Sequence, residues 1–246
     1  MGQELLKPEL SGDKVAKILN VINKLKIKGD RLLDVGCADG NLTIHLKEAL
    51  ESSAAFGIEI SQQRAEIARA KGIEVIQMDI EETALPFDDS TFDVILCGEL
   101  MEHLYNPSHL LREIFRCLKP GGNCIIVIPN LASWHSRLLL LFGYQPYSMS
   151  VSPEFHDLGF LFRGSWEAGD HLYEGGKDHI RVMTWRAFRE LITLHKFQVK
   201  CVVGMPTGGT LLNPPLRSLF RLLENLACRF PGLASFILAV LVKPCQ

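Results

Sequence analysis

The chain alternates between short runs of apolar residues and longer segments in which apolar residues recur at helical spacing. Short apolar runs are typical of buried strands, and the longer spacing is typical of amphipathic helices. The first half of the chain predicts strands at residues 31–36, 54–61, 73–79, 92–98 and 123–130. It predicts helices before and between them at residues 13–28, 41–50, 61–72 and 109–122. Strands alternating with helices, and apolar on both faces, favour a parallel sheet covered on each side by helices.

We therefore expect one domain over residues 1–246, of the doubly wound α/β class, with its ligand-binding half in residues 1–130. Residues 131–183 predict an insertion over the carboxyl edge of the sheet, and its Gly- and His-rich part has the composition of a lid. Residues 184–246 predict a helix at 184–196, strands at 197–204 and 235–244, and an excursion over 205–232 with one helix at 216–228.

Charge, cysteine spacing and the lengths of the apolar runs disfavour several classes of protein. The formal net charge is −2 and the charges are interspersed, which disfavours nucleic acid as a partner. Seven cysteines form no CxxC pair, so we expect reduced thiols and no metal site. The N-terminal residues lack the features of a signal peptide, and the apolar runs are too short for a transmembrane segment, so the expected location is cytoplasmic.

The candidate chemistry begins at LLDVGCADGN, residues 32–41, where a predicted strand meets a predicted helix. In an open α/β sheet, ligands bind outside the carboxyl ends of the strands. Asp34 lies in the apolar run, which ends at Val35, and Gly36, Ala38 and Gly40 follow at a spacing of two. Small residues let the backbone approach a ligand, and the helix offers free N–H groups. The spacing differs from the G-x-G-x-x-G of nicotinamide oxidoreductases, which disfavours that class.

Four segments in order resemble one family. They are D-x-G-x-A-x-G at residues 34–40, an acid at Glu59, QMDIEETALPF at 77–87 with Asp79, and the run LPFDDSTFDVILCGELMEHL to LREIFRCLKPGGNCIIVIPN over 85–130. Together they are similar to the class I S-adenosylmethionine-dependent methyltransferases of type 11, the group that includes quinone-biosynthesis methyltransferases. Ala38 stands where the family motif has its middle glycine. The resemblance implies a seven-stranded Rossmann-like sheet of order 3-2-1-4-5-7-6, with strand 7, residues 235–244, antiparallel.

The resemblance also implies which residues bind S-adenosylmethionine. Asp34 and Gly36 would meet the methionine moiety, Glu59 the ribose hydroxyls, Asp79 and the Ile80 backbone the adenine, and Gly98 and Glu99 would lie beneath the sulfonium. The full cofactor-binding set is Asp34, Gly36, Cys37, Ala38, Gly40, Glu59, Ile60, Asp79, Ile80, Gly98 and Glu99.

Methyl transfer requires mainly positioning and exclusion of water, but an oxygen acceptor can also need a general base. His103 and His179 are the candidate bases, because histidine titrates near neutral pH. His103 follows the fourth predicted strand at the cofactor edge, and His179 precedes the helix that the resemblance places beside the acceptor pocket. For His103, orientation of the loop after the fourth strand is an equally good interpretation.

The predicted activity is methylation of a small molecule, with O-methylation favoured and S-adenosylhomocysteine as product. Two alternatives stay open: a protein that binds the cofactor without transferring the methyl group, and C- or N-methylation of a quinone or lipid-like acceptor. The apolar segment 134–142 is compatible with simple burial, an acceptor pocket, a homodimer contact or peripheral contact with a membrane.

Overall fold

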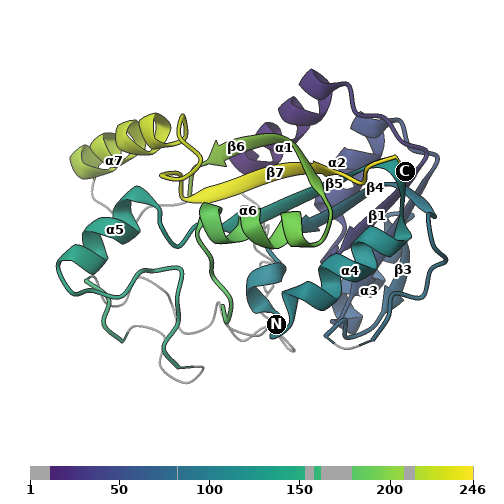
Figure 1. The fold of residues 1–246 in the computed structure, drawn as a ribbon, viewed down its shortest axis with the longest axis horizontal. Helices are drawn as coiled ribbons and strands as arrows, with labels where there is room; N and C mark the ends of the chain where they lie inside the picture. The colour runs from purple at the N-terminus through teal and green to yellow at the C-terminus, as the bar shows by residue number, and fades with distance from the viewer. Residues whose placement is uncertain (1–11, 82, 153–157, 162–178, 208–213, 246) are drawn as a thin grey trace, which may run out of the picture.

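The structure, a computed structural model, describes residues 12–81, 83–152, 158–161, 179–207 and 214–245 (Figure 1). Its strands are β1 (Arg31–Val35), β2 (Ala54–Glu59), β3 (Glu74–Gln77), β4 (Phe92–Gly98), β5 (Leu118–Pro129), β6 (Gln198–Met205) and β7 (Phe236–Val242). Its helices are α1 (Gly12–Leu25), α2 (Asn41–Leu50), α3 (Gln62–Ala70), the 3-10 turn η1 (Met101–His103), α4 (Pro107–Cys117), α5 (Trp134–Leu141), α6 (Trp185–Leu194) and α7 (Pro214–Ala227).

The strands form one seven-stranded sheet in the order β3-β2-β1-β4-β5-β7-β6. Neighbours from β3 to β5 are parallel, and β7 is antiparallel to both β5 and β6. This confirms the predicted fold class, strand order and orientation of the last strand. Parallel pairing requires crossovers. Helices α2, α3 and α4 lie in the connections β1–β2, β2–β3 and β4–β5, whereas the described residues between β3 and β4 form no helix.

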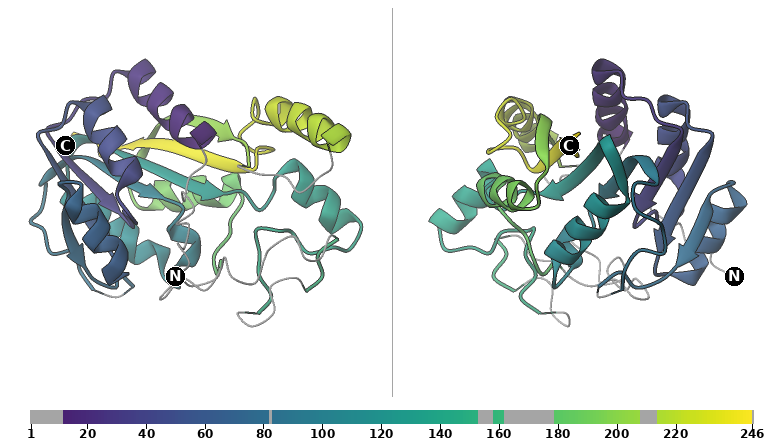
Figure 2. Two further views of the ribbon diagram at one scale, coloured as in Figure 1. Left: turned by 180° about the vertical axis from the view of Figure 1, so that it is seen from behind. Right: turned by 45° about the vertical axis from the view of Figure 1, so that its right-hand side comes forward.

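Helices cover both faces of the sheet (Figures 1 and 2). On one face, Ile114 of α4 and Phe188 of α6 belong to a core with the sheet. On the other, Ile18 of α1, Leu46 of α2 and Ala65 of α3 belong to a second core. The strands between them are apolar on both sides, as the sequence pattern predicts.

Along strand β4, successive side chains belong alternately to the two cores. Ile95 and Cys97 belong to the core beneath α4 and α6, whereas Val94 and Leu96 belong to the core beneath α1 to α3. Successive side chains of a strand point to opposite faces, so a continuous apolar run is what a sheet covered on both sides requires.

Several boundaries differ from the prediction, among them the ends of α4 and β3. α4 ends at Cys117, where the sequence predicts a helix to Gly122, and β5 already begins at Leu118, which pairs with Phe92 of β4. Lys119 precedes Pro120, and a residue before proline is disfavoured in the helical region. β3 ends at Gln77, so Asp79 lies beyond the strand rather than at its end.

Asn130, which is 1% exposed, connects the segments that follow the sheet. Its side-chain amide donates to the Ala234 carbonyl at 2.9 Å, and its side-chain oxygen accepts from the Ala132 N–H at 3.0 Å. Asn130 also forms a parallel bridge with Met183. Residues 130–132 therefore lie beside Met183 and beside the residues that lead into β7.

Candidate active site

The loop after β1 has a backbone that favours glycine. Gly36, Ala38 and Gly40 have φ angles of +79°, +49° and +77°. The N–H groups of Gly36 and Cys37 both donate to the Ile58 carbonyl of β2, at 2.9 and 3.0 Å. These hydrogen bonds hold the loop against the carboxyl end of β2. The loop then leads into the N-terminus of α2.

Ala38, the departure from the family motif, occupies the left-handed region that a glycine adopts without cost. For an L-residue with a side chain this conformation costs roughly 1–2 kcal/mol. The Ala38 side chain is 5% exposed, so its methyl group is packed inside the protein. Alanine thus retains the conformation of the loop at this position and adds some strain.

Cys37 lies over β2 rather than facing the edge of the sheet. Its side chain is 4% exposed, and a Cβ atom at Gly57 would lie 2.5 Å from the Cys37 sulfur. Gly57 must therefore be glycine for the loop to pack this closely. Cys37 contributes its backbone to the loop, while its thiol belongs to the core.

Glu59, the last residue of β2, binds the loop through its carboxylate. One oxygen accepts from the Ala38 N–H at 2.9 Å and the other from the Ser61 N–H at 2.8 Å. Only 7% of the residue is exposed. The carboxylate is thus oriented at the carboxyl edge of the sheet, where its remaining lone pairs can accept hydrogen bonds from a ligand.

Asp34 is similarly oriented from the next strand. It is 3% exposed and accepts a hydrogen bond at 2.5 Å from the hydroxyl of Thr43 in α2. Asp79, by contrast, is exposed, and its side chain accepts from the Glu81 N–H at 3.0 Å. Ile80 is 7% exposed and belongs to the core, whereas Ile60 is 41% exposed.

The end of β4 is open beside Gly98. A Cβ atom added there would meet no atom of the described residues within 4 Å. The next residue, Glu99, has a φ of +51° and forms an ion pair with Lys14 of α1, with 2.5 Å between Nζ and Oε1. The Lys14 ammonium also lies 3.3 Å from the centre of the Phe236 ring. Gly98, the glycine-type turn and the oriented Asp34 and Glu59 carboxylates lie at the edge where the resemblance places S-adenosylmethionine, and their small size and acceptor oxygens are compatible with it.

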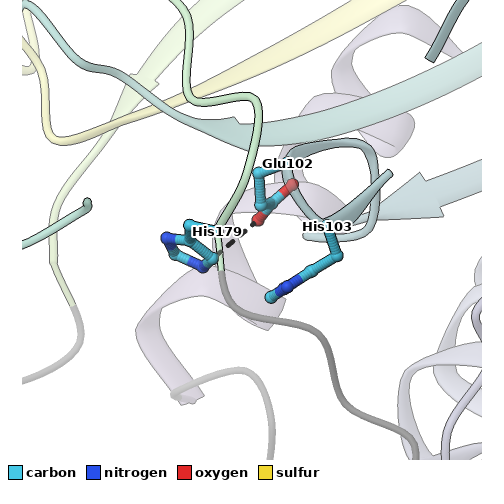
Figure 3. Close-up of side chains that lie close together, drawn as sticks. All are labelled: Glu102, His103 and His179. Atoms are coloured by element: carbon cyan, nitrogen blue, oxygen red, sulfur yellow. Dashed lines mark ion pairs between the residues drawn. The ribbon is translucent and has the colours of Figure 1, made fainter. Parts of the chain in front are cut away.

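The two candidate bases lie together, although they are far apart in the sequence (Figure 3). The ring centres of His103 and His179 are 4.7 Å apart. Glu102 of η1 completes the cluster, with 4.0 Å between its Oε1 and His179 Nε2. His179 Nδ1 lies 2.8 Å from the Ser148 carbonyl oxygen. The backbone joins the same elements, because the Ile180 and Arg181 N–H groups contact the Glu102 carbonyl at 2.6 and 2.9 Å.

Glu102 is a candidate site residue that the sequence did not predict. It is 2% exposed, and neither carboxylate oxygen has a hydrogen-bond partner within the described part of the chain. Burial, and then repulsion from Glu99, raises the pKa of Glu102 to about 8. The one signal in the sequence was the position of Glu102 between the end of a predicted strand and His103. Its burial depends on contacts with distant segments and is not visible in the neighbouring residues.

Replacing Glu102 with glutamine is expected to flatten the pH dependence of stability. The folded protein keeps the Glu102 proton up to about pH 8, whereas the unfolded chain loses it near the ordinary pKa of 4.5. Because the folded state binds more protons in this interval, the free energy of unfolding of the wild type falls as the pH rises through it. Urea denaturation between about pH 5 and 8 measures the slope, and equal slopes in wild type and Glu102→Gln would contradict the assignment.

The Glu102, His103 and His179 ligand atoms all lie within 4.8 Å of one another, which makes the three the candidate cation ligands among the described residues. Nitrogen and carboxylate ligands of this kind suit first-row transition metals. The metal-free site expected from the sequence stays a prediction.

Known proteins resemble this chain over the segments that form the candidate site. The family described as "Methyltransferase domain" matches residues 33–126. A ubiquinone biosynthesis O-methyltransferase of Marinobacter nauticus is 28% identical over 187 residues, which is 72% of this chain and 76% of that protein. An uncharacterized protein of Methanocaldococcus jannaschii is 31% identical over 186 residues, covering 76% of this chain and 82% of that one.

Among solved structures, an S-adenosylmethionine-dependent methyltransferase from Mesorhizobium loti has the same fold. Its TM-score is 0.60 at 16% sequence identity, and the match covers 94% of this chain and 99% of that one. At this identity the likeness concerns the fold alone. The residues matched by the family include the loop after β1, Glu59, Asp79 and the end of β4.

Proposed function

Because the chain belongs to the class I S-adenosylmethionine-dependent methyltransferases, we propose that it methylates a hydroxyl oxygen of a small molecule, with His179 as the general base. The observation that carries this proposal is the cluster of Glu102, His103 and His179 just beyond the carboxyl end of β4. The cluster combines a buried carboxyl group with two imidazoles, which is suitable for accepting a proton.

Cofactor binding would use the loop after β1 and the ends of β2 and β4. Backbone N–H groups at the start of α2 and the small residues Gly36, Ala38 and Gly40 allow close approach of the methionine moiety. Glu59 would accept from the ribose hydroxyls and Asp79 from the adenine. Support comes from the orientation of the Glu59 carboxylate, which two backbone N–H groups hold at this edge.

When bound, S-adenosylmethionine supplies an activated methyl group on a positively charged sulfur. An acceptor hydroxyl that receives this methyl group would have to lose its proton. His179 Nε2 would accept this proton. The protein's main contribution is to hold the acceptor in line and to exclude water.

The hydrogen bond at the other ring nitrogen supports this role for His179. Nδ1 lies 2.8 Å from a carbonyl oxygen, which can only accept, so the neutral ring carries its proton on Nδ1. Nε2 is then the basic nitrogen, and it is the nitrogen that faces Glu102. An imidazolium formed there would be stabilised by ionisation of Glu102, which makes Glu102 a positioning residue for the base.

For the acceptor we propose an aromatic hydroxyl compound of the quinol class. The support is a relative's name: the matching protein of Marinobacter nauticus is a ubiquinone biosynthesis O-methyltransferase. The apolar residues of α5, directly after β5, are also compatible with a lipid-like acceptor.

Methyl-labelled S-adenosylmethionine tests the proposal with a matched pair of acceptors: a prenylated catechol or quinol, and the same compound with that hydroxyl already methylated. We expect label on oxygen in the first compound and no label in the second. Label on a ring carbon in both would contradict O-methylation. Cofactor binding by calorimetry without transfer to any member of an acceptor panel would favour a binding protein without transfer activity.

A further inference from the structure

Helix α7 packs with an acidic residue inward and its leucines outward. Glu224 is 3% exposed and accepts hydrogen bonds from Trp134 Nε1 at 2.7 Å, the Ser235 hydroxyl at 2.6 Å and the Thr207 N–H at 2.8 Å. Among residues 216–227 of the helix, Glu224 and Ala227 alone are buried. An amphipathic helix normally buries its apolar stripe against the core, so this orientation leaves that stripe without a use in the fold.

The exposed leucines of α7 occupy one face. Positions 216, 219, 223 and 226 recur at intervals of three and four residues, which brings them to the same side of a helix. Each of the leucines is between 37% and 65% exposed; they are Leu216, Leu219, Leu222, Leu223 and Leu226.

Helix α5 lies beside α7 and extends the apolar area (Figures 1 and 2). The Trp134 ring packs on Phe220 of α7 with 5.2 Å between ring centres. Leu141 and Phe142, at the end of α5, are 75% and 73% exposed. We call the exposed apolar residues of 138–142 and 216–226, with Phe230, the α5/α7 surface.

Within the two described segments that form the α5/α7 surface, the exposed charges have one sign. Residues 131–152 and 214–235 contain Arg137, Arg217, Arg221 and Arg229, all exposed, and their one acid is the buried Glu224. Exposed leucines with arginines and without exposed carboxylates suit an anionic lipid interface. A second copy of this chain would fit less well, because a self-complementary contact brings the arginines together with no carboxylate to pair them.

We propose that the α5/α7 surface binds the surface of a bilayer that contains anionic phospholipid. The leucines and Phe142 would enter the headgroup boundary, and the arginines would contact lipid phosphates. The proposed contact is interfacial, because the apolar residues lie on the exposed face of helices that pack on the protein. No helix among the described residues is long and apolar enough to cross a membrane.

The position of the surface relates it to the candidate active site. α5 follows the carboxyl end of β5, and β7 begins beside it, with Phe236 paired to Pro129. Docking would hold the carboxyl edge of the sheet near the membrane, from which an apolar acceptor could enter. Membrane binding itself does not depend on the proposed reaction and is measured without turnover.

Sedimentation with vesicles tests the proposal, using phosphatidylcholine alone and phosphatidylcholine mixed with phosphatidylglycerol. We expect the wild type to sediment with the mixed vesicles and the double variant Leu219→Glu/Leu226→Glu to bind at least about tenfold more weakly. Leu194→Glu is the matched control, since Leu194 is an 80% exposed leucine on α6, and it should bind as the wild type does. Arg221→Gln/Arg229→Gln should weaken binding to the mixed vesicles and reduce its salt dependence.

Unchanged S-adenosylmethionine binding by calorimetry verifies that each variant is folded. A wild type that stays in solution with both vesicle types would overturn the proposal, as would an equal loss of binding in Leu194→Glu. A dimer in sedimentation velocity that Leu219→Glu/Leu226→Glu dissociates, without vesicle binding by the wild type, would instead identify the surface as a contact between two copies.

Discussion

Replacing His179 with alanine is expected to lower the rate of methyl transfer by about 10²- to 10⁴-fold, the usual contribution of a general base. The reason is the loss of Nε2, the nitrogen that the hydrogen bond at Nδ1 leaves unprotonated. The affinity for S-adenosylmethionine should not change, because His179 is outside the predicted cofactor-binding set. Initial rates at saturating cofactor, with calorimetry for binding, separate the two effects.

Two histidine variants make this test specific. His45→Ala removes an exposed histidine of α2 and should leave the rate unchanged. His103→Ala removes the other candidate, whose ring lies 4.7 Å from that of His179, and we expect a smaller loss than in His179→Ala. A larger loss in His103→Ala would transfer the role of base to His103, and comparable turnover in His179→Ala would exclude His179.

The second large effect is expected at Glu59. Glu59→Ala should weaken S-adenosylmethionine binding by about 10- to 100-fold, because hydrogen bonds to a charged group contribute roughly 1.5–3 kcal/mol. It should also lower the free energy of unfolding by about 1–3 kcal/mol, since the Ala38 and Ser61 N–H groups lose their acceptor. Calorimetry measures the first change and urea denaturation the second.

Asp39→Ala is the matched control for Glu59. Asp39 is an acid of the same loop that pairs with Lys71, at 3.0 Å, and lies outside the predicted cofactor-binding set. Its loss should leave cofactor affinity unchanged. If Glu59→Ala lowered stability but kept the affinity of the wild type, Glu59 would serve only to hold the loop, and the ribose assignment would be wrong.

The sheet and the loop after β1 follow from local patterns in the sequence. Apolar runs such as Val94 to Cys97 must be covered on both faces, and the helices between the strands leave parallel pairing as the solution. The loop at 36–40 was equally readable, since small residues directly after a buried strand indicate a tight turn there. These features depend on neighbours in the sequence.

The periodicity of apolar residues predicted the ends of helices less accurately than their presence. The predicted helix at 109–122 continued the periodicity of α4, but Leu118 pairs with Phe92 across the sheet, and that long-range pairing ends the helix at Cys117. Pro120 was a local signal for this break, because the residue before a proline is disfavoured in a helix. The predicted end of the helix, Gly122, lies five residues after the observed end, Cys117.

The surroundings of the Glu102 carboxyl group and the His179 imidazole depend on contacts between distant segments, which are visible in the tertiary structure alone. Glu102 and His179 come from distant segments, and their approach to 4.0 Å depends on how the residues around Ile180 pack against η1. The sequence predicts a helix at 216–228 without assigning its inward face, and in the structure Glu224 faces inward with hydrogen bonds from Trp134, Thr207 and Ser235. Burial and orientation are properties of contacts between segments, and for that reason periodicity alone could not assign them.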